Sequence, residues 1–176
     1  YGCAGTTATE YGVACLELEA CDSGLRSMVS VQGSLAMYAI WKWASEEEKQ
    51  RWLPGMAAGE LIGCFGLTEP DHGSDPANMR TRARRDGGDW ILDGRKMWIT
   101  NGPIAETLVV YAKTDPEAGP KGITAFLIEK DMAGFAIGQK IDKMGMRGSP
   151  TAELVFNDCL VPAENVMGPL NGGVGV

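Results

Sequence analysis

The sequence predicts an α+β fold in which helices at the start of the chain are followed by an antiparallel β-barrel or sandwich. Two observations predict it. Apolar residues recur at helical spacing over residues 9–44, and from residue 61 short segments with strand-like alternation follow one another closely. Strands do not alternate with helices, and neither GxGxxG nor a Walker A sequence occurs, which excludes a Rossmann fold. We expect the change from helices to strands near residues 59–63.

Two long helices are expected first. Residues 9–22 place apolar side chains on one helical face, and Ser23 and Gly24 break the pattern. Residues 25–44 give a second helix that is apolar almost all round, so we expect it to be well buried.

A third helix is expected to begin at Ser45, because Ser45 followed by Glu48 is a capping-box sequence. Proline lacks a backbone N–H and clashes with the preceding helical turn, so Pro54 and Gly55 should end this helix. Residues 57–60 can add one further turn.

At least six short strands are expected after the helices, separated by polar and glycine-rich turns. Gly87–Gly88 and Asp93–Gly94 are predicted as turns, and residues 115–122 as a loop. Short strands at this close spacing are typical of an antiparallel sandwich or barrel. The expected strands cover residues 61–67, 79–85, 89–94, 95–101, 107–114, 123–130 and 151–158.

Composition argues against several classes of function. The chain of 176 residues has a formal net charge of −7, so nucleic acid is not expected as a partner, since phosphate contacts need clustered Lys and Arg. No apolar run approaches the ~20 residues that span a bilayer, so no membrane association is expected. Five scattered cysteines without a CxxC pair, together with a single histidine, predict free buried thiols and no metal site.

Two stretches combine apolar strands with polar side chains. In CFGLTEPDHGSD, residues 64–75, a strand ends in a turn that presents a hydroxyl and several amides, which suits a polar ring system or a phosphate. In KMWITNG, residues 96–102, Trp98 and Thr100 share one face of a strand, where they can cover an aromatic cofactor and bond to its edge. Taken singly, a capped turn and a core Trp are the simpler interpretations.

Together, GLTEPDHGSDP and GRKMWITNG at this separation resemble the acyl-CoA dehydrogenase family, flavoproteins that oxidise acyl-CoA thioesters. The resemblance extends over the whole chain, including the later MGMRGSPTAELVFNDCLVPAENVMG. It implies that residues 1–60 end an N-terminal helical domain and that residues 61–169 form a middle β-domain that binds FAD and acyl-CoA. Residues 170–176 would begin a C-terminal helical domain. We therefore expect a fragment whose catalytic glutamate lies beyond Val176, and we assign no catalytic base.

The resemblance also implies FAD as the cofactor, together with the residues that surround it. Gly73 and Ser74 are expected near the pyrophosphate, and Ser74 also near the CoA part of the substrate. Glu69 and His72 are expected to be structural residues of the turn. The residues expected along the flavin are Phe65, Leu67, Thr68, Trp98, Ile99 and Thr100, with the Thr100 hydroxyl reaching flavin N5.

Residues 17–34, ELEACDSGLRSMVSVQGS, resemble the glutaryl-CoA dehydrogenase branch, whose members oxidise and decarboxylate glutaryl-CoA to crotonyl-CoA. The resemblance implies that Arg26, with Ser27 beside it, pairs with the distal carboxylate of that substrate. A carboxylate in an otherwise apolar pocket needs such a cation. From position alone, Arg26 can instead extend from the helix start to place its charge in water, or pair only with Asp22 or Glu19.

The two parts of the chain point to different branches. Residues 1–100 resemble glutaryl-CoA dehydrogenases, whereas residues 101–176 resemble isovaleryl-CoA dehydrogenases, so isovaleryl-CoA or another short or branched acyl-CoA is the alternative substrate. An acyl-CoA oxidase and a non-catalytic ligand-binding β-domain are further alternatives. The resemblance also implies an electron-transfer flavoprotein as partner, a homotetramer, and a location in the mitochondrial matrix or the bacterial cytoplasm.

Overall fold

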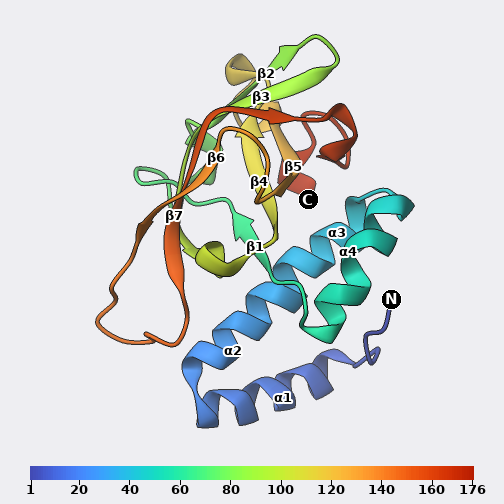
Figure 1. Cartoon of the computed structure of the whole chain (residues 1–176), viewed down its shortest axis with the longest axis vertical. Coiled ribbons are helices and arrows are strands. Elements are labelled where there is room, and N and C mark those ends of the chain that lie inside the picture. The colour runs from blue at the N-terminus through green and yellow to red at the C-terminus, as the bar shows by residue number, and fades with distance from the viewer.

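The computed structural model describes residues 1–176 and places four α-helices against one end of an eight-stranded sheet (Figure 1). The predicted order, helices and then strands, is confirmed. The helices are α1 (Ala8–Cys21), α2 (Ser23–Ser30), α3 (Tyr38–Trp43) and α4 (Glu46–Ala58). The strands are β1 (Gly63–Gly66), β2 (Arg82–Asp86), β3 (Asp89–Thr100), β4 (Thr107–Lys113), β5 (Ile123–Glu129), β6 (Phe135–Lys140), β7 (Thr151–Val161) and β8 (Val166–Met167). None of the helices has the length and apolarity needed to cross a membrane.

The boundary between α1 and α2 lies at Asp22, one residue before the predicted break. Asp22 has extended backbone angles, ends α1, and caps α2 by accepting hydrogen bonds from the amides of Gly24 and Leu25 at 2.6 and 3.3 Å. A carboxylate at this position satisfies amides that a helix start leaves without partners. Ser23 and Gly24 therefore belong to the first turn of α2 and do not separate the helices.

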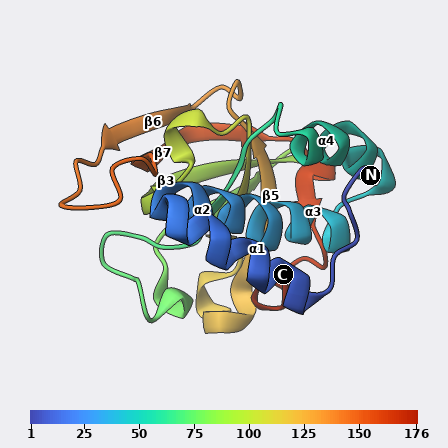
Figure 2. The same cartoon turned by 90° about the horizontal axis from the view of Figure 1, so that it is seen from below.

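Residues 23–43 form one continuous helix in which a π-helical stretch, Val31–Met37, joins α2 to α3. The expectation that this helix is well buried is wrong for much of its surface. Its buried residues include Ala36, Ala39 and Ile40, which face the sheet side, whereas Tyr38 and Trp41 are about half exposed. Figure 2 shows α1 lying across the outer side of the helix, and α1 covers only part of it.

Helix α4 continues through the predicted stop. It begins at Ser45, whose hydroxyl accepts from the Glu48 amide at 3.2 Å, but the Glu48 carboxylate accepts from the Trp52 indole at 2.8 Å and does not complete the capping box. Pro54 lies inside α4, which ends only at Gly59 in the left-handed conformation. Buried Trp52, Leu53 and Met56 hold this helix against the sheet on both sides of the proline, and tertiary packing outweighs one missing hydrogen bond.

The sheet has the strand order β6-β7-β3-β2-β4-β5-β8, with β1 paired to β4. Most pairings are antiparallel as predicted, but β1 runs parallel to β4 and β2 has one parallel contact with it, so the sheet is mixed. β6 and β8 were not predicted from the sequence. β6 has no fully buried position and β8 has only two residues, so neither produces the alternation that identifies a strand.

β3 is one long strand, and the predicted turn at Asp93–Gly94 is wrong. The strand passes through this point with a β-bulge in its pairing with β7 between Leu92 and Gly94. Gly94 has φ 150°, and a Cβ there would lie 2.7 Å from the Cα of Thr81. The glycine therefore permits a close crossing of two chain segments and does not form a hairpin.

The core has two parts, one inside the folded sheet and one between the sheet and the helices. Leu92, Val110 and Phe126 belong to the first part, whereas Ile40 and Met56 pack against β4 and β5 in the second. Every cysteine is a free thiol, as predicted. Cys64 and Cys159 are buried, as expected. Cys3 and Cys21 are exposed: Cys3 lies in the segment before α1, and Cys21 is the last residue of α1.

Candidate functional site

The two polar stretches meet where β1 ends. Beyond Gly66 the chain passes beside β3, and the Met97 amide donates to the Thr68 carbonyl at 2.9 Å. The predicted flavin residues at 67–68 and those at 98–100 therefore come from neighbouring segments. The site is built from the end of one strand and the bulged part of another.

A second bulge in β3 exposes Trp98. The pairing of β3 with β7 is interrupted between Lys96 and Ile99, and Trp98 has φ 63°, in the left-handed region. Its side chain is 59% exposed, an unusual amount for an indole in a strand. Ile99 lies 3% exposed in the core, so its side chain is turned away from this surface, and Thr100 is half-buried at the strand end.

The segment opposite Trp98 offers hydrogen-bond donors without partners. The amides of Leu67 and Thr68 donate to no acceptor in the chain, and Thr68 is half-buried. The turn that follows exposes Gly73 and Ser74 and is held by reciprocal backbone hydrogen bonds between Glu69 and His72 at 3.1 and 3.3 Å. These contacts give Glu69 and His72 the structural place expected of them.

This donor set fits a flavin. Free amides at 67–68 can donate to the pyrimidine edge of an isoalloxazine ring, the open face of Trp98 can cover the ring, and an exposed Gly-Ser turn can bind a pyrophosphate. The Met97 N–H joins the segment at 67–68 directly to the strand that carries Trp98. The arrangement can therefore hold a polar aromatic cofactor by several modest hydrogen bonds.

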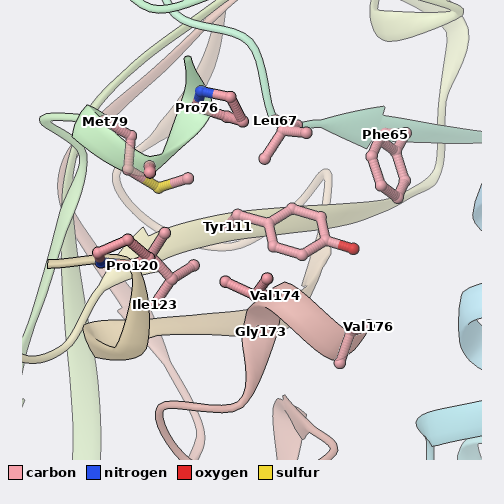
Figure 3. A pocket seen from close by; sticks show the side chains of 11 residues that line it. Phe65, Leu67, Pro76, Met79, Tyr111, Pro120, Ile123, Gly173, Val174 and Val176 are labelled. Carbon is pink, nitrogen blue, oxygen red and sulfur yellow. The ribbon is translucent and has the colours of Figure 1, made fainter. Parts of the chain in front are cut away.

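Phe65 and Leu67 direct their side chains into an apolar pocket of about 280 Å³, drawn in Figure 3. The Tyr111 ring crosses the pocket, 5.1 Å from Phe65 between ring centroids, and burial raises the pKa of its hydroxyl. Val174 and Val176 line the side of the pocket opposite Phe65 and Leu67 (Figure 3). The pocket is lined by Phe65, Leu67, Pro76, Ala77, Met79, Tyr111, Pro120, Ile123, Gly173, Val174 and Val176.

Arg26 lies on α2 and forms an ion pair with Glu19 of α1. Its Nε donates to Glu19 Oε2 at 2.6 Å, and the Ser23 hydroxyl also donates to that carboxylate. The two terminal nitrogens of Arg26 have no partner in the chain, and Ser27 is half-buried beside it. Pairing with Glu19 is one of the arrangements expected from position, and it leaves the terminal nitrogens of the guanidinium free.

Asn101 connects this helix to the predicted flavin strand. It follows Thr100 directly, is fully buried with φ 64°, and its Nδ2 donates to the carbonyls of Met28 and Gly63 at 3.4 and 3.3 Å. Sequence reasoning missed this role. Its only signal was an amide side chain at the end of an apolar strand, where Asn tolerates a left-handed conformation.

Sequence reasoning also missed a buried ion pair between Lys96 and Glu69. Lys96 is fully buried and Glu69 is 4% exposed, and their charged groups are 2.8 Å apart. Burial lowers the pKa of Lys96 to about 8, against the opposing effect of Glu69. Burial alone would raise the pKa of Glu69, but the charge of Lys96 and the amides of Arg80 and Thr81 together hold it below its usual range.

Acid should remove the contribution of Glu69 to stability. Because its pKa is lowered on folding, the unfolded chain binds the proton more readily, and the stabilisation is complete only above the unfolded pKa of about 4.3. We expect the difference in unfolding free energy between the wild type and Glu69→Gln to shrink as pH falls below that value. Urea unfolding at several pH values measures it; a difference that grows in acid would contradict the assignment.

Comparison with known proteins gives two family matches and close relatives. Residues 1–60 match "Acyl-CoA dehydrogenase, N-terminal domain", and residues 64–159 match "Acyl-CoA dehydrogenase, middle domain". An isovaleryl-CoA dehydrogenase of Solanum tuberosum is 46% identical over 99% of this chain and 42% of its own length. A 2-methylacyl-CoA dehydrogenase of the same species is 47% identical over 92% of this chain and 39% of its own length.

Among solved structures, a glutaryl-CoA dehydrogenase from Mycobacterium smegmatis in complex with FADH2 superposes with a TM-score of 0.92 at 56% identity. The match covers 99% of this chain and 44% of that one. The chain thus spans about two fifths of the length of the curated relatives it matches.

Proposed function

Because the chain belongs to the acyl-CoA dehydrogenase family, we propose that it forms the FAD- and acyl-CoA-binding part of a dehydrogenase for a short acyl-CoA, and that this substrate is glutaryl-CoA. The observation that carries the choice of substrate is Arg26. Its guanidinium lies on a mostly apolar helix, is held by Glu19 through Nε, and keeps its terminal nitrogens free for a carboxylate. The glutaryl-CoA dehydrogenase among the similar structures supports this choice.

In this proposal FAD, when bound, takes up the hydride that leaves Cβ of the acyl group. The amides of Leu67 and Thr68 donate to its pyrimidine edge, where negative charge accumulates on reduction. Trp98 covers the ring and the Thr100 hydroxyl lies at the ring edge, next to the backbone of Ile99. Gly73 and Ser74 bind the pyrophosphate, and Ser74 also contacts the CoA.

The catalytic glutamate that takes the α-proton is proposed to lie outside these 176 residues, as the family resemblance implies. The chain then binds and orients cofactor and substrate, and electrons pass to an electron-transfer flavoprotein. We propose a homotetramer in the mitochondrial matrix or the bacterial cytoplasm, and the mitochondrial relatives support the first of these locations.

Isovaleryl-CoA is the second candidate substrate. The isovaleryl-CoA dehydrogenase of Solanum tuberosum is 46% identical to the chain, and residues 101–176 carry the stronger resemblance to that branch. The acyl end of isovaleryl-CoA is apolar, so it would have no use for the free guanidinium nitrogens of Arg26.

Calorimetric titration of the FAD-loaded chain with glutaryl-CoA and, in parallel, isovaleryl-CoA tests the proposal. We expect glutaryl-CoA to bind more tightly, with a heat signal that weakens at high salt because an ion pair is formed. Equal or tighter binding of isovaleryl-CoA would transfer the assignment to the second candidate. A chain that takes up no FAD would overturn the proposed function altogether. In an anaerobic sample, bleaching of the flavin by either compound would show that the base lies within the chain.

A further inference from the structure

The buried ion pair between Lys96 and Glu69 differs from the other ion pairs of the chain. Each of the others has at least one partner that is well exposed, whereas this pair has almost no contact with solvent. Removing two charges from water is costly, and such pairs often contribute little net stability compared with apolar residues of the same size. The position of the pair therefore needs another explanation than stability.

The Lys96 ammonium holds one short segment, residues 67–69. The Lys96 ammonium donates to the Leu67 carbonyl at 3.1 Å and to the Glu69 carboxylate at 2.8 Å. That carboxylate also accepts from the amides of Arg80 and Thr81 at 2.6 and 2.9 Å, which anchors it to the residues just before β2. Glu69 thus compensates the charge of Lys96 and fixes its position, while Lys96 holds the backbone carbonyl of Leu67.

The adjacent residue of β3 holds the next carbonyl. Because β3 is bulged after Lys96, Met97 turns its N–H from β7 to the Thr68 carbonyl at 2.9 Å. Two consecutive residues of β3 therefore fix two consecutive carbonyls of the polar segment. These are the two segments that we propose to contact the flavin, and the ion pair lies at their junction.

Fixing a carbonyl also fixes the amide that follows it. A trans peptide unit is planar, so its N–H points opposite to its C=O. When Lys96 binds the Leu67 carbonyl, the Thr68 N–H of the same peptide unit must point to the other side, and there it has no acceptor in the chain. That amide is one of the two donors proposed for the pyrimidine edge.

We propose that Lys96 is a positioning residue for the flavin: held by Glu69, its ammonium fixes the Leu67–Thr68 peptide so that the Thr68 N–H points at the pyrimidine edge. This inference rests on the proposed function. It explains why a lysine without any access to solvent lies in a strand beside the site. Lys96 itself touches neither cofactor nor substrate in this arrangement.

The test compares FAD affinity, measured by quenching of flavin fluorescence, in four forms of the chain. Lys96→Met keeps the length of the side chain and removes the donor. The double variant Lys96→Met/Glu69→Gln removes both charges, so no charge is left buried without a partner if the single variant folds poorly. Ile128→Ala is the matched control, because it loosens the core at β5 by an amount comparable to that expected for Lys96→Met, and Ile128 belongs to a different part of the core from Leu67. Circular dichroism checks that each variant is folded.

We expect both Lys96 variants to bind FAD roughly tenfold more weakly, the loss of about one hydrogen bond to a fixed donor, and the control to bind within about twofold of the wild type. Hydrogen exchange supplies the second readout. The amides of Met97 and Glu69 should exchange faster in the Lys96 variants, while those of the β4–β5 ladder should not.

Each outcome decides the matter. If the wild type binds FAD and the Lys96 variants bind it equally well, the positioning role is overturned and the proposed function stands. If Ile128→Ala loses as much affinity as the Lys96 variants, the effect is general destabilisation and the positioning role is again overturned. If the wild-type chain binds no FAD, the proposed function falls and the inference falls with it.

Discussion

Replacing Arg26 by glutamine is expected to weaken the binding of glutaryl-CoA roughly hundredfold, or about 3 kcal/mol, because the distal carboxylate of this substrate loses its cation in an apolar surrounding. Glutamine is shorter than arginine but keeps a polar side chain with good helix propensity at the helix surface, so α2 should remain folded. Binding of isovaleryl-CoA should change little, since its acyl end carries no charge. Calorimetric titration of FAD-loaded wild type and variant with both thioesters gives the ratio of their dissociation constants for each compound.

Arg82→Gln provides the control for this experiment, because Arg82 is an exposed residue of β2, and β2 lies at the opposite end of the molecule from α2 (Figure 1). The same loss of positive charge there should leave both affinities within about twofold, as expected for a charge that is screened by solvent. If Arg26→Gln weakens both thioesters equally, Arg26 acts only through its ion pair with Glu19, and the glutaryl-CoA assignment fails.

Elements with a strong periodic pattern could be predicted from the sequence, and those decided by tertiary contacts could not. The helices over 9–22 and 25–44 and the buried strand at 107–114 follow directly from the spacing of apolar residues. The passage of α4 through Pro54 depends on the packing of that helix on the sheet. The passage of β3 through Gly94 depends on Thr81, a residue thirteen positions earlier that packs against the glycine.

The candidate site was predictable only in part. The motifs containing Thr68 and Trp98 could be identified because they carry a resemblance, and the structure brings them side by side. The roles of Asn101 and Lys96 could not be identified, because both depend on which backbone carbonyls lie nearby, and a sequence does not contain that information. Lysine is almost never fully buried unless it is paired, and nothing in the sequence around Lys96 indicates its partner Glu69, 27 residues earlier.

The second large effect is expected on stability, from breaking the buried pair. Lys96→Met should lower the free energy of unfolding by about 3–5 kcal/mol, because it leaves the Glu69 carboxylate charged and out of contact with water. The double variant Lys96→Met/Glu69→Gln should lose less than the sum of the two single changes, since neither side chain is then charged. Urea unfolding followed by tryptophan fluorescence measures the free energy of unfolding of the wild type, the two single variants and the double variant.

Arg51→Met is the control that distinguishes the effect of burial from the effect of losing an ion pair, because the pair it breaks is exposed to solvent. Arg51 bonds Glu129 through both terminal nitrogens at 2.7 Å, a better geometry than that of Lys96, but its side chain is 52% exposed. Its loss should cost less than about 1 kcal/mol, because the Glu129 carboxylate that is left behind is partly exposed and can be solvated by water. Were Lys96→Met to cost no more than Arg51→Met, water would have to reach Glu69 in the variant, and the segment at 67–69 would have to move to admit it. The same movement would turn the Thr68 amide away from the site. The loss of stability and the loss of FAD affinity should therefore both depend on the position of the segment at 67–69.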